Sequence, residues 1–275
     1  MKKIFVSLIM FLVVSGLAFG VTFSDFQKMP VGTNEEKLAK IKVAESLLPT
    51  NLTEREKELT LSFLTRVNIN FDKNKALEYA NQLETFLGRK VNVKGVVLYG
   101  MVGKAAETIS YFKDFISEGK APIGEIRGSY WYLYTLGKRT KNTSLALESA
   151  RGLLNSLSYF KSKAVQEYYY GWTKIVLPTA LKGLNVSEQV NLLVKVSKNF
   201  DNDIRGELIS LAVSKITTSD LVTVEQVSLF LNCEKVLSIS DNADLISQIF
   251  SEISRKTGIK EVNELEVENW IQENK

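Results

Sequence analysis

The sequence contains no histidine and a single cysteine, Cys233. Without histidine, Ser-His-Asp and Cys-His catalysis, His-ligated zinc or iron sites and His proton shuttles are excluded. A single cysteine also excludes an intramolecular disulfide framework and any CxxC metal or redox motif. Catalysis by this chain would therefore have to depend on carboxylates.

Proline is scarce as well, and neither sign of charge dominates. The 275 residues include 4 Pro, 35 Lys and Arg, and 31 Asp and Glu, with 45% hydrophobic residues. This is ordinary globular composition, which excludes a low-complexity or disordered chain. Basic groups such as Arg89-Lys90 fall at expected helix ends, where they complement the helix dipole. With no recognisable nucleic-acid-binding motif, the sequence argues against a nucleic-acid partner.

The N-terminus has the pattern of an export signal. Lys2 and Lys3 precede an apolar stretch, residues 4–17, and residues 18–20 place small side chains at the −3 and −1 positions of a cleavage site. We expect residues 1–20 to be a cleaved signal peptide and residues 21–275 to form one helical-repeat domain, periplasmic or extracellular and of bacterial type. Removing the two lysines from the 35 basic residues leaves 33 against 31 acidic ones, a net charge of +2. The alternative is a retained anchor, since about 16 apolar residues are near the short end for a membrane span.

Beyond residue 20 the patterns are helical. Thr33 and Thr53 are each followed three residues later by glutamate, as in the capping box. Apolar residues recur at helical spacing, and only residues 91–97 and 221–227 leave a strand open, because β-branched residues are frequent there. The sequence therefore predicts an all-α fold. The predicted helices are 33–48, 53–70, 73–88, 92–118, 122–140, 142–160, 162–183, 187–200, 202–217, 220–238, 241–257 and 260–273.

These helices pair with a period near 40 residues, which is typical of stacked helical repeats. We expect an α-solenoid of about six antiparallel hairpins, a superhelical array of the tetratricopeptide or HEAT kind. No unit contains the tetratricopeptide signature in register, so the likeness is architectural. Any up-and-down array of helices of this length would give the same period, and that alternative stays open.

Two aromatic clusters, in residues 129–134 and 167–172, lie about 40 residues apart at similar places in consecutive units. Neighbouring residues on a helix point roughly 100° apart, so these rings cannot all enter one core stripe. One interpretation is a groove that binds a peptide or glycan, and the other is that the rings are core. The candidate groove residues are Tyr99, Tyr130, Trp131, Tyr134, Tyr168, Tyr169 and Trp172.

The sequence thus favours an exported, non-enzymatic protein without cofactor or metal that binds another envelope or secreted protein, a peptide or a glycan. The alternative is a carboxylate-dependent enzyme acting on cell-wall or other polysaccharide, with Glu125 and Glu167, each five or six residues before a Trp or Tyr group, as the acid pair. A third interpretation is a scaffold whose aromatics are only core. Gly100 and Gly103 are expected to let another helix approach closely, and the Cys233 thiol is expected to be buried.

Overall fold

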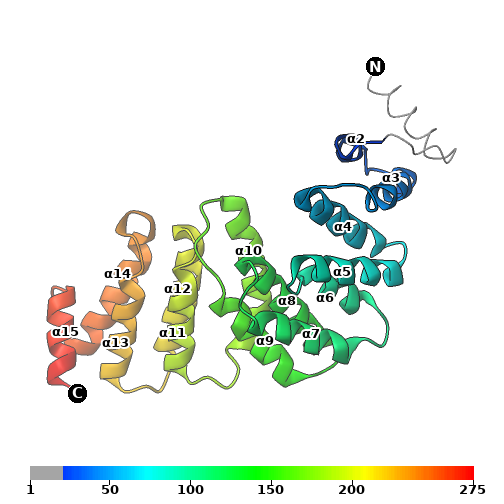
Figure 1. The fold of residues 1–275 in the computed structure, drawn as a ribbon. Helices are drawn as coiled ribbons and strands as arrows, with labels where there is room; N and C mark the ends of the chain where they lie inside the picture. The colour runs from blue at the N-terminus through cyan, green and yellow to red at the C-terminus, as the bar shows by residue number, and fades with distance from the viewer. Residues whose placement is uncertain (1–20) are drawn as a thin grey trace. The chain divides into compact units, whose positions relative to one another are not determined.

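A computed structural model describes residues 21–275; the predicted signal peptide, residues 1–20, lies outside the described residues. The described part of the chain contains fourteen α-helices and no β-strand (Figure 1). The all-α prediction is confirmed. Both segments for which a strand was left open are largely helical, in α6 (Asn92–Gly100) and α13 (Thr223–Glu234).

The contacts divide the chain into two compact units, and the boundary between them in the sequence falls between Leu136 and Gly137. In the first unit each helix from α2 to α6 packs against the next one in the chain, and α4 also packs against α6. Its helices are α2 (Phe23–Lys28), α3 (Asn34–Leu47), α4 (Glu54–Asn68), α5 (Lys73–Leu87), α6, α7 (Ala105–Ser117) and most of α8 (Ile123–Arg139).

The second unit follows the same rule of local packing. Here α9 packs on α10, and α11, α12 and α13 each contact the helix next but one as well as the following helix. In Figure 1, α11 to α15 stand side by side within this unit. Its helices are α9 (Thr143–Asn155), α10 (Lys163–Ala180), α11 (Val186–Ser197), α12 (Asn202–Thr217), α13, α14 (Ile239–Thr257) and α15 (Glu264–Glu273).

The predicted helix boundaries hold where a cap defines them. Thr33 and Thr53 both form complete capping boxes with the glutamate three residues later. Gly88 ends α5 in the left-handed conformation, with φ 62°, where a side chain would be strained. The start of α11 differs by one residue, since the helix begins at Val186 and the predicted start is residue 187. Its cap is Asn185, whose side-chain oxygen accepts from the amide of Glu188 at 2.8 Å.

The prediction of one long helix over residues 92–118 is wrong. The chain leaves the helix after Gly100 and resumes at Ala105, with Gly103 at φ 78°. Gly100 and Gly103 therefore form part of a turn and do not make a helix-packing face. The close approach occurs instead at Gly95, where an added Cβ would lie within 2.8 Å of three ring atoms of Phe112.

Buried residues recur at helical spacing, although Leu38 and Leu211, which belong to the same apolar patterns, are 46% and 40% exposed. Helix α12 is buried on two sides, through Leu208 and Ala212 on one stripe and Ile209 and Val213 on another, as expected for a helix packed between neighbours. Cys233 is fully buried, which confirms the prediction of a core thiol.

Candidate binding site: the aromatic clusters

The aromatic residues of the first unit are mostly packed among themselves. The ring of Tyr99, on α6, lies 5.0 Å from that of Tyr132, on α8, and the Tyr132 ring stacks on Phe112 at 5.7 Å with an interplanar angle of 4°. Trp131 and Tyr134 are 6.1 Å apart. Such offset and tilted pairs are the arrangements that aromatic rings prefer in protein cores.

Exposure separates the predicted groove residues of this unit into two groups. Tyr134 is only 5% exposed and belongs to the core, while Tyr99, Tyr130 and Trp131 are half-buried.

The second unit presents its aromatics differently. On α10 the rings of Tyr168, Tyr169 and Trp172 are in mutual contact, with centroids 4.9 to 5.5 Å apart. Phe160, from the segment before α10, stacks on Tyr169 at 4.8 Å with an interplanar angle of 10°. Tyr168 is 56% exposed and Ile175 is 54% exposed, while Tyr169, Trp172 and Phe160 are half-buried. We call these five residues the α10 aromatic face.

The spacing explains why three of these side chains are aligned on α10. Tyr168, Trp172 and Ile175 are separated by four and three residues, so their side chains follow one line along the helix. Tyr169 extends that line sideways toward Phe160. The line is about two helical turns long, and the exposed side chains of Glu167 and Lys174 follow it on the same helix.

The opposite side of α10 is anchored in the unit. Tyr170 packs its ring 5.8 Å from Phe200 and donates its hydroxyl proton to Glu207. Burial and this carboxylate raise the pKa of Tyr170 above its ordinary value. Thr173 and Val176 on the same helix are buried. Since one side of α10 is fixed in this way, the aromatic face is fixed on the other.

A buried glutamine holds Phe160 in place. Gln166 is 1% exposed. Its side-chain nitrogen donates to the carbonyl of Phe160 at 2.6 Å, and its oxygen accepts from the amide of Asp201 at 2.6 Å. Sequence reasoning missed this residue. A polar residue inside the apolar pattern of a helix was the available signal, but its partners are distant in sequence.

The two carboxylates of the alternative enzyme interpretation fall in different units. Glu125, in the first unit, lies 4.0 Å from the guanidinium of Arg89, and Glu167 is an exposed residue of α10 in the second. Neither unit by itself contains both groups. Within residues 21–275, no cluster of three or more cysteine and carboxylate side chains has an arrangement that could hold a metal ion.

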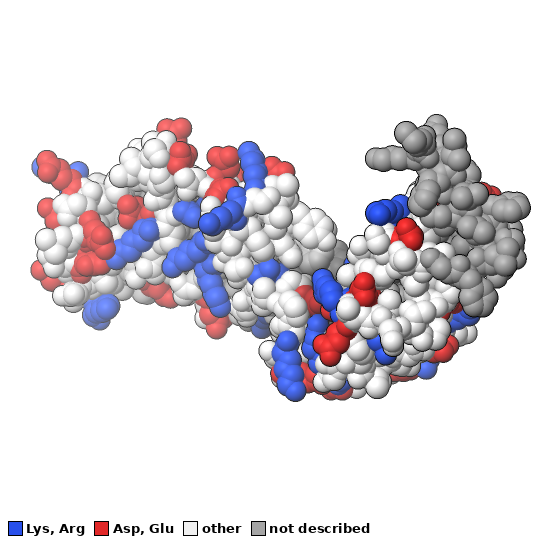
Figure 2. Space-filling view, turned by 45° about the horizontal axis from the view of Figure 1, so that its top comes forward, with Lys and Arg blue, Asp and Glu red and all other residues white. Residues whose placement is uncertain are grey.

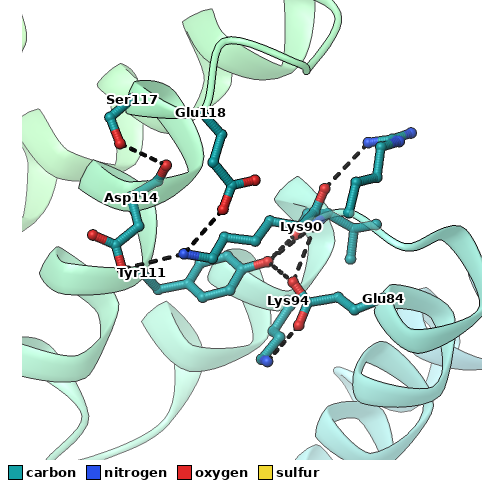
Figure 3. Close-up of polar contacts among 9 residues, drawn as sticks. Glu84, Lys90, Lys94, Tyr111, Asp114, Ser117 and Glu118 are labelled. Atoms are coloured by element: carbon teal, nitrogen blue, oxygen red, sulfur yellow. Dashed lines mark hydrogen bonds and ion pairs between the residues drawn. The ribbon is translucent and has the colours of Figure 1, made fainter.

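A polar network in the first unit connects α5, α6 and α7 (Figure 3). The hydroxyl of Tyr111, on α7, accepts from the backbone amide of Val91 at 3.0 Å and contacts Glu84 on α5. Glu84 in turn pairs with Lys94 on α6 at 2.5 Å. Burial, followed by the carboxylate of Glu84, raises the pKa of Tyr111. This network fixes the turn between α5 and α6 against α7.

Lys90, on the same turn, extends the network outward. Its ammonium group lies 3.2 Å from Asp114 and 3.3 Å from Glu118, both near the end of α7. In Figure 3 these two carboxylates approach the lysine from the same helix. The network, which we call the Tyr111 brace, therefore connects the turn between α5 and α6 to α7 through a hydrogen bond and ion pairs.

Comparison with known proteins adds no family: no family model, curated protein sequence or solved structure matches the chain. None of the described helices is both long enough and apolar enough to cross a membrane. In Figure 2, acidic and basic side chains are interspersed over the visible surface of each unit, with uncharged surface between them.

Proposed function

We propose that the chain is an exported, non-enzymatic helical-repeat protein that binds a segment of another envelope or secreted protein through the α10 aromatic face. The observation that supports this most is the exposure of Tyr168, 56%, on a face of mutually contacting rings. Large exposed aromatic surfaces on a rigid element are typical of protein-recognition sites. The aliphatic side chain of Ile175 on the same line favours a peptide over a sugar.

A repeat architecture agrees with this function. In each unit, helices pack on the next helix in the chain, and several also contact the next but one, as stacked hairpins do. We propose that the chain is an α-solenoid of antiparallel hairpins, in which binding surfaces are built from helices that are themselves held on other sides. The signal-like pattern of residues 1–20 supports export.

Tryptophan fluorescence tests the proposal directly. In a Trp131→Phe, Trp270→Phe background, Trp172 is the only tryptophan and reports on the face. We expect strong quenching by acrylamide, reduced after addition of peptides selected from a phage-displayed library. Tyr168→Ala should weaken those peptides by about tenfold or more, as for a binding hot spot. Phe71→Ala, which removes an exposed aromatic of the first unit, is the matched control and should leave binding unchanged.

Two results would contradict the proposal. If Tyr168→Ala binds the selected peptides as tightly as the unmodified protein, the face is not the site. If chitohexaose or soluble peptidoglycan fragments protect Trp172 and peptides do not, the ligand is a glycan. The neighbouring carboxylates would then be tested by Glu167→Gln in a hydrolysis assay.

A further inference from the structure

The first unit contains a cleft of about 310 Å³ that the proposed function does not use. It lies between the middle of α4, the end of α5 and the start of α6, with Glu125 of α8 at its edge. Every residue that lines it belongs to the first unit. Its location is therefore independent of the α10 aromatic face.

One wall of this cleft is apolar. Leu83 and Val91 are 3% and 5% exposed, and Leu87, Val93 and Val96 are half-buried beside them. Several of these side chains also pack against the core of the first unit, so the wall is backed by fixed neighbours. An apolar side chain entering the cleft would gain buried area without displacing the fold.

The two acidic side chains at the cleft have cationic partners, whereas one of the basic side chains has no anionic partner. Glu58 is held by Arg55 at 2.7 Å. Glu125 lies 4.0 Å from Arg89, the outer limit for an ion pair. Among the described residues, the guanidinium of Arg66 has no hydrogen-bond or ion-pair partner, although Arg66 lines the same cleft. The uncommitted charge is therefore a guanidinium, whose planar donors match a carboxylate.

The walls of the cleft are also held at a fixed spacing. The side-chain nitrogen of Asn92, at the start of α6, donates to the carbonyl of Glu125 at 3.1 Å and to the hydroxyl of Ser129 at 2.8 Å. On the other side, the Tyr111 brace binds the amide of Val91, two residues after Arg89. A ligand would meet a site that needs little rearrangement, which lowers the cost of binding.

From this combination we infer that the cleft binds a peptide segment in which an apolar side chain neighbours an acidic one. The apolar residue packs on Val91 and Val96, and the carboxylate pairs with Arg66. A basic segment is disfavoured because the two acidic groups at the cleft already have cationic partners. A purely apolar segment would leave the guanidinium of Arg66 without compensation.

Fluorescence anisotropy of a labelled hexapeptide that alternates aspartate with leucine tests the inference on the complete protein. We expect this peptide to bind more tightly than a counterpart with asparagine in place of aspartate. Arg66→Gln should weaken it about tenfold, the order expected for a lost charge-assisted hydrogen bond. Lys42→Gln, which removes an exposed cation of the same unit outside the cleft, should leave affinity unchanged.

A second variant is expected to change the affinity for the aspartate peptide in the opposite direction. Glu125→Gln removes a negative charge beside Arg89 and should tighten the aspartate peptide, while circular dichroism checks that each variant is folded. The inference is overturned if the aspartate and asparagine peptides bind equally, if Arg66→Gln and Lys42→Gln behave alike, or if succinate competes as well as the peptide does, which would indicate a small-anion site. Tyr168→Ala should have no effect on this peptide, so failure here and failure of the α10 site can be told apart.

Discussion

Gly95 offers the sharpest test of the packing described for the first unit. It lies in α6, is buried, and faces the ring of Phe112 so closely that an alanine Cβ would lie within 2.8 Å of Cδ1, Cε1 and Cζ. Phe112 is fully buried and stacks on Tyr132, so its ring has no open space into which it can turn. Gly95→Ala therefore forces either the ring or the helix to move.

The magnitude follows from two opposed effects. Overpacking of a well-packed core costs about 1–3 kcal/mol, and replacing a mid-helix glycine by alanine returns up to about 1 kcal/mol of helix propensity. We expect Gly95→Ala to lower the free energy of unfolding by about 1–2 kcal/mol. Gly128→Ala in α8 is the matched control, because its Cβ would meet nothing closer than a side-chain nitrogen of Asn92 at 3.8 Å. There only the propensity gain remains, up to about 1 kcal/mol of stabilisation.

Urea unfolding followed by circular dichroism measures both variants. Opposite signs for the two glycine-to-alanine changes would support the packing, and equal gains in stability would refute it. A double-mutant cycle with Phe112→Leu strengthens the test. If the clash with Phe112 is the cause, the destabilisation by Gly95→Ala should shrink when the ring is absent. An unchanged penalty would place the cause elsewhere in α6.

Three further predictions concern other parts of the structure. Tyr111→Phe should cost about 1–2 kcal/mol, because it removes a buried hydroxyl that accepts from Val91, whereas Tyr159→Phe, at an exposed tyrosine, should cost less. The pKa of Tyr111 is raised in the folded protein above its unfolded value near 10. The protonated hydroxyl therefore makes its full contribution to the free energy of unfolding below pH 10, and this contribution falls as the pH rises further. The unmodified protein should therefore lose stability relative to Tyr111→Phe in alkaline urea titrations, and parallel profiles would contradict this. Thr53→Ala removes a capping box and should cost about 1 kcal/mol by urea unfolding, while no change would mean that the cap adds nothing to stability. Burial raises the pKa of the Cys233 thiol to about 12, so iodoacetamide at pH 8 should label it only after unfolding, and fast labelling of the native protein would disprove its burial.

The sequence predicted what local rules determine. Helix starts at Thr33 and Thr53, the glycine end of α5 and the burial of Cys233 follow from residue types within a few positions of each other. The break between α6 and α7 was missed because Gly100 and Gly103 suit both a helix contact and a turn. Only the position of Phe112 beside Gly95 shows which glycine admits a close neighbour.

The candidate sites depended on tertiary structure to a greater degree. The aromatic pattern identified Tyr134 and Tyr168 as equals, yet one is core and the other more than half exposed. This difference depends on which side of each helix is packed, and adjacent aromatics in sequence do not record it. No local pattern in the sequence indicated the cleft of the first unit. Arg66 and Arg89 lie at helix ends, where basic residues are favoured by the helix dipole in any case.

The two proposed sites differ in their physics, and ionic strength separates them. The α10 aromatic face contains no charged residue, so binding there depends on apolar contact and should change little with salt. The cleft depends on an exposed guanidinium, whose attraction for a carboxylate is screened within about 10 Å at 0.1 M salt. A ligand whose affinity falls steeply with salt is therefore expected to lose affinity in Arg66→Gln and not in Tyr168→Ala, and a salt-insensitive ligand should behave in the opposite way. If a salt-sensitive ligand responds only to Tyr168→Ala, the assignment of apolar recognition to the α10 aromatic face is wrong, and a salt-insensitive ligand that responds only to Arg66→Gln would contradict charge recognition at the cleft.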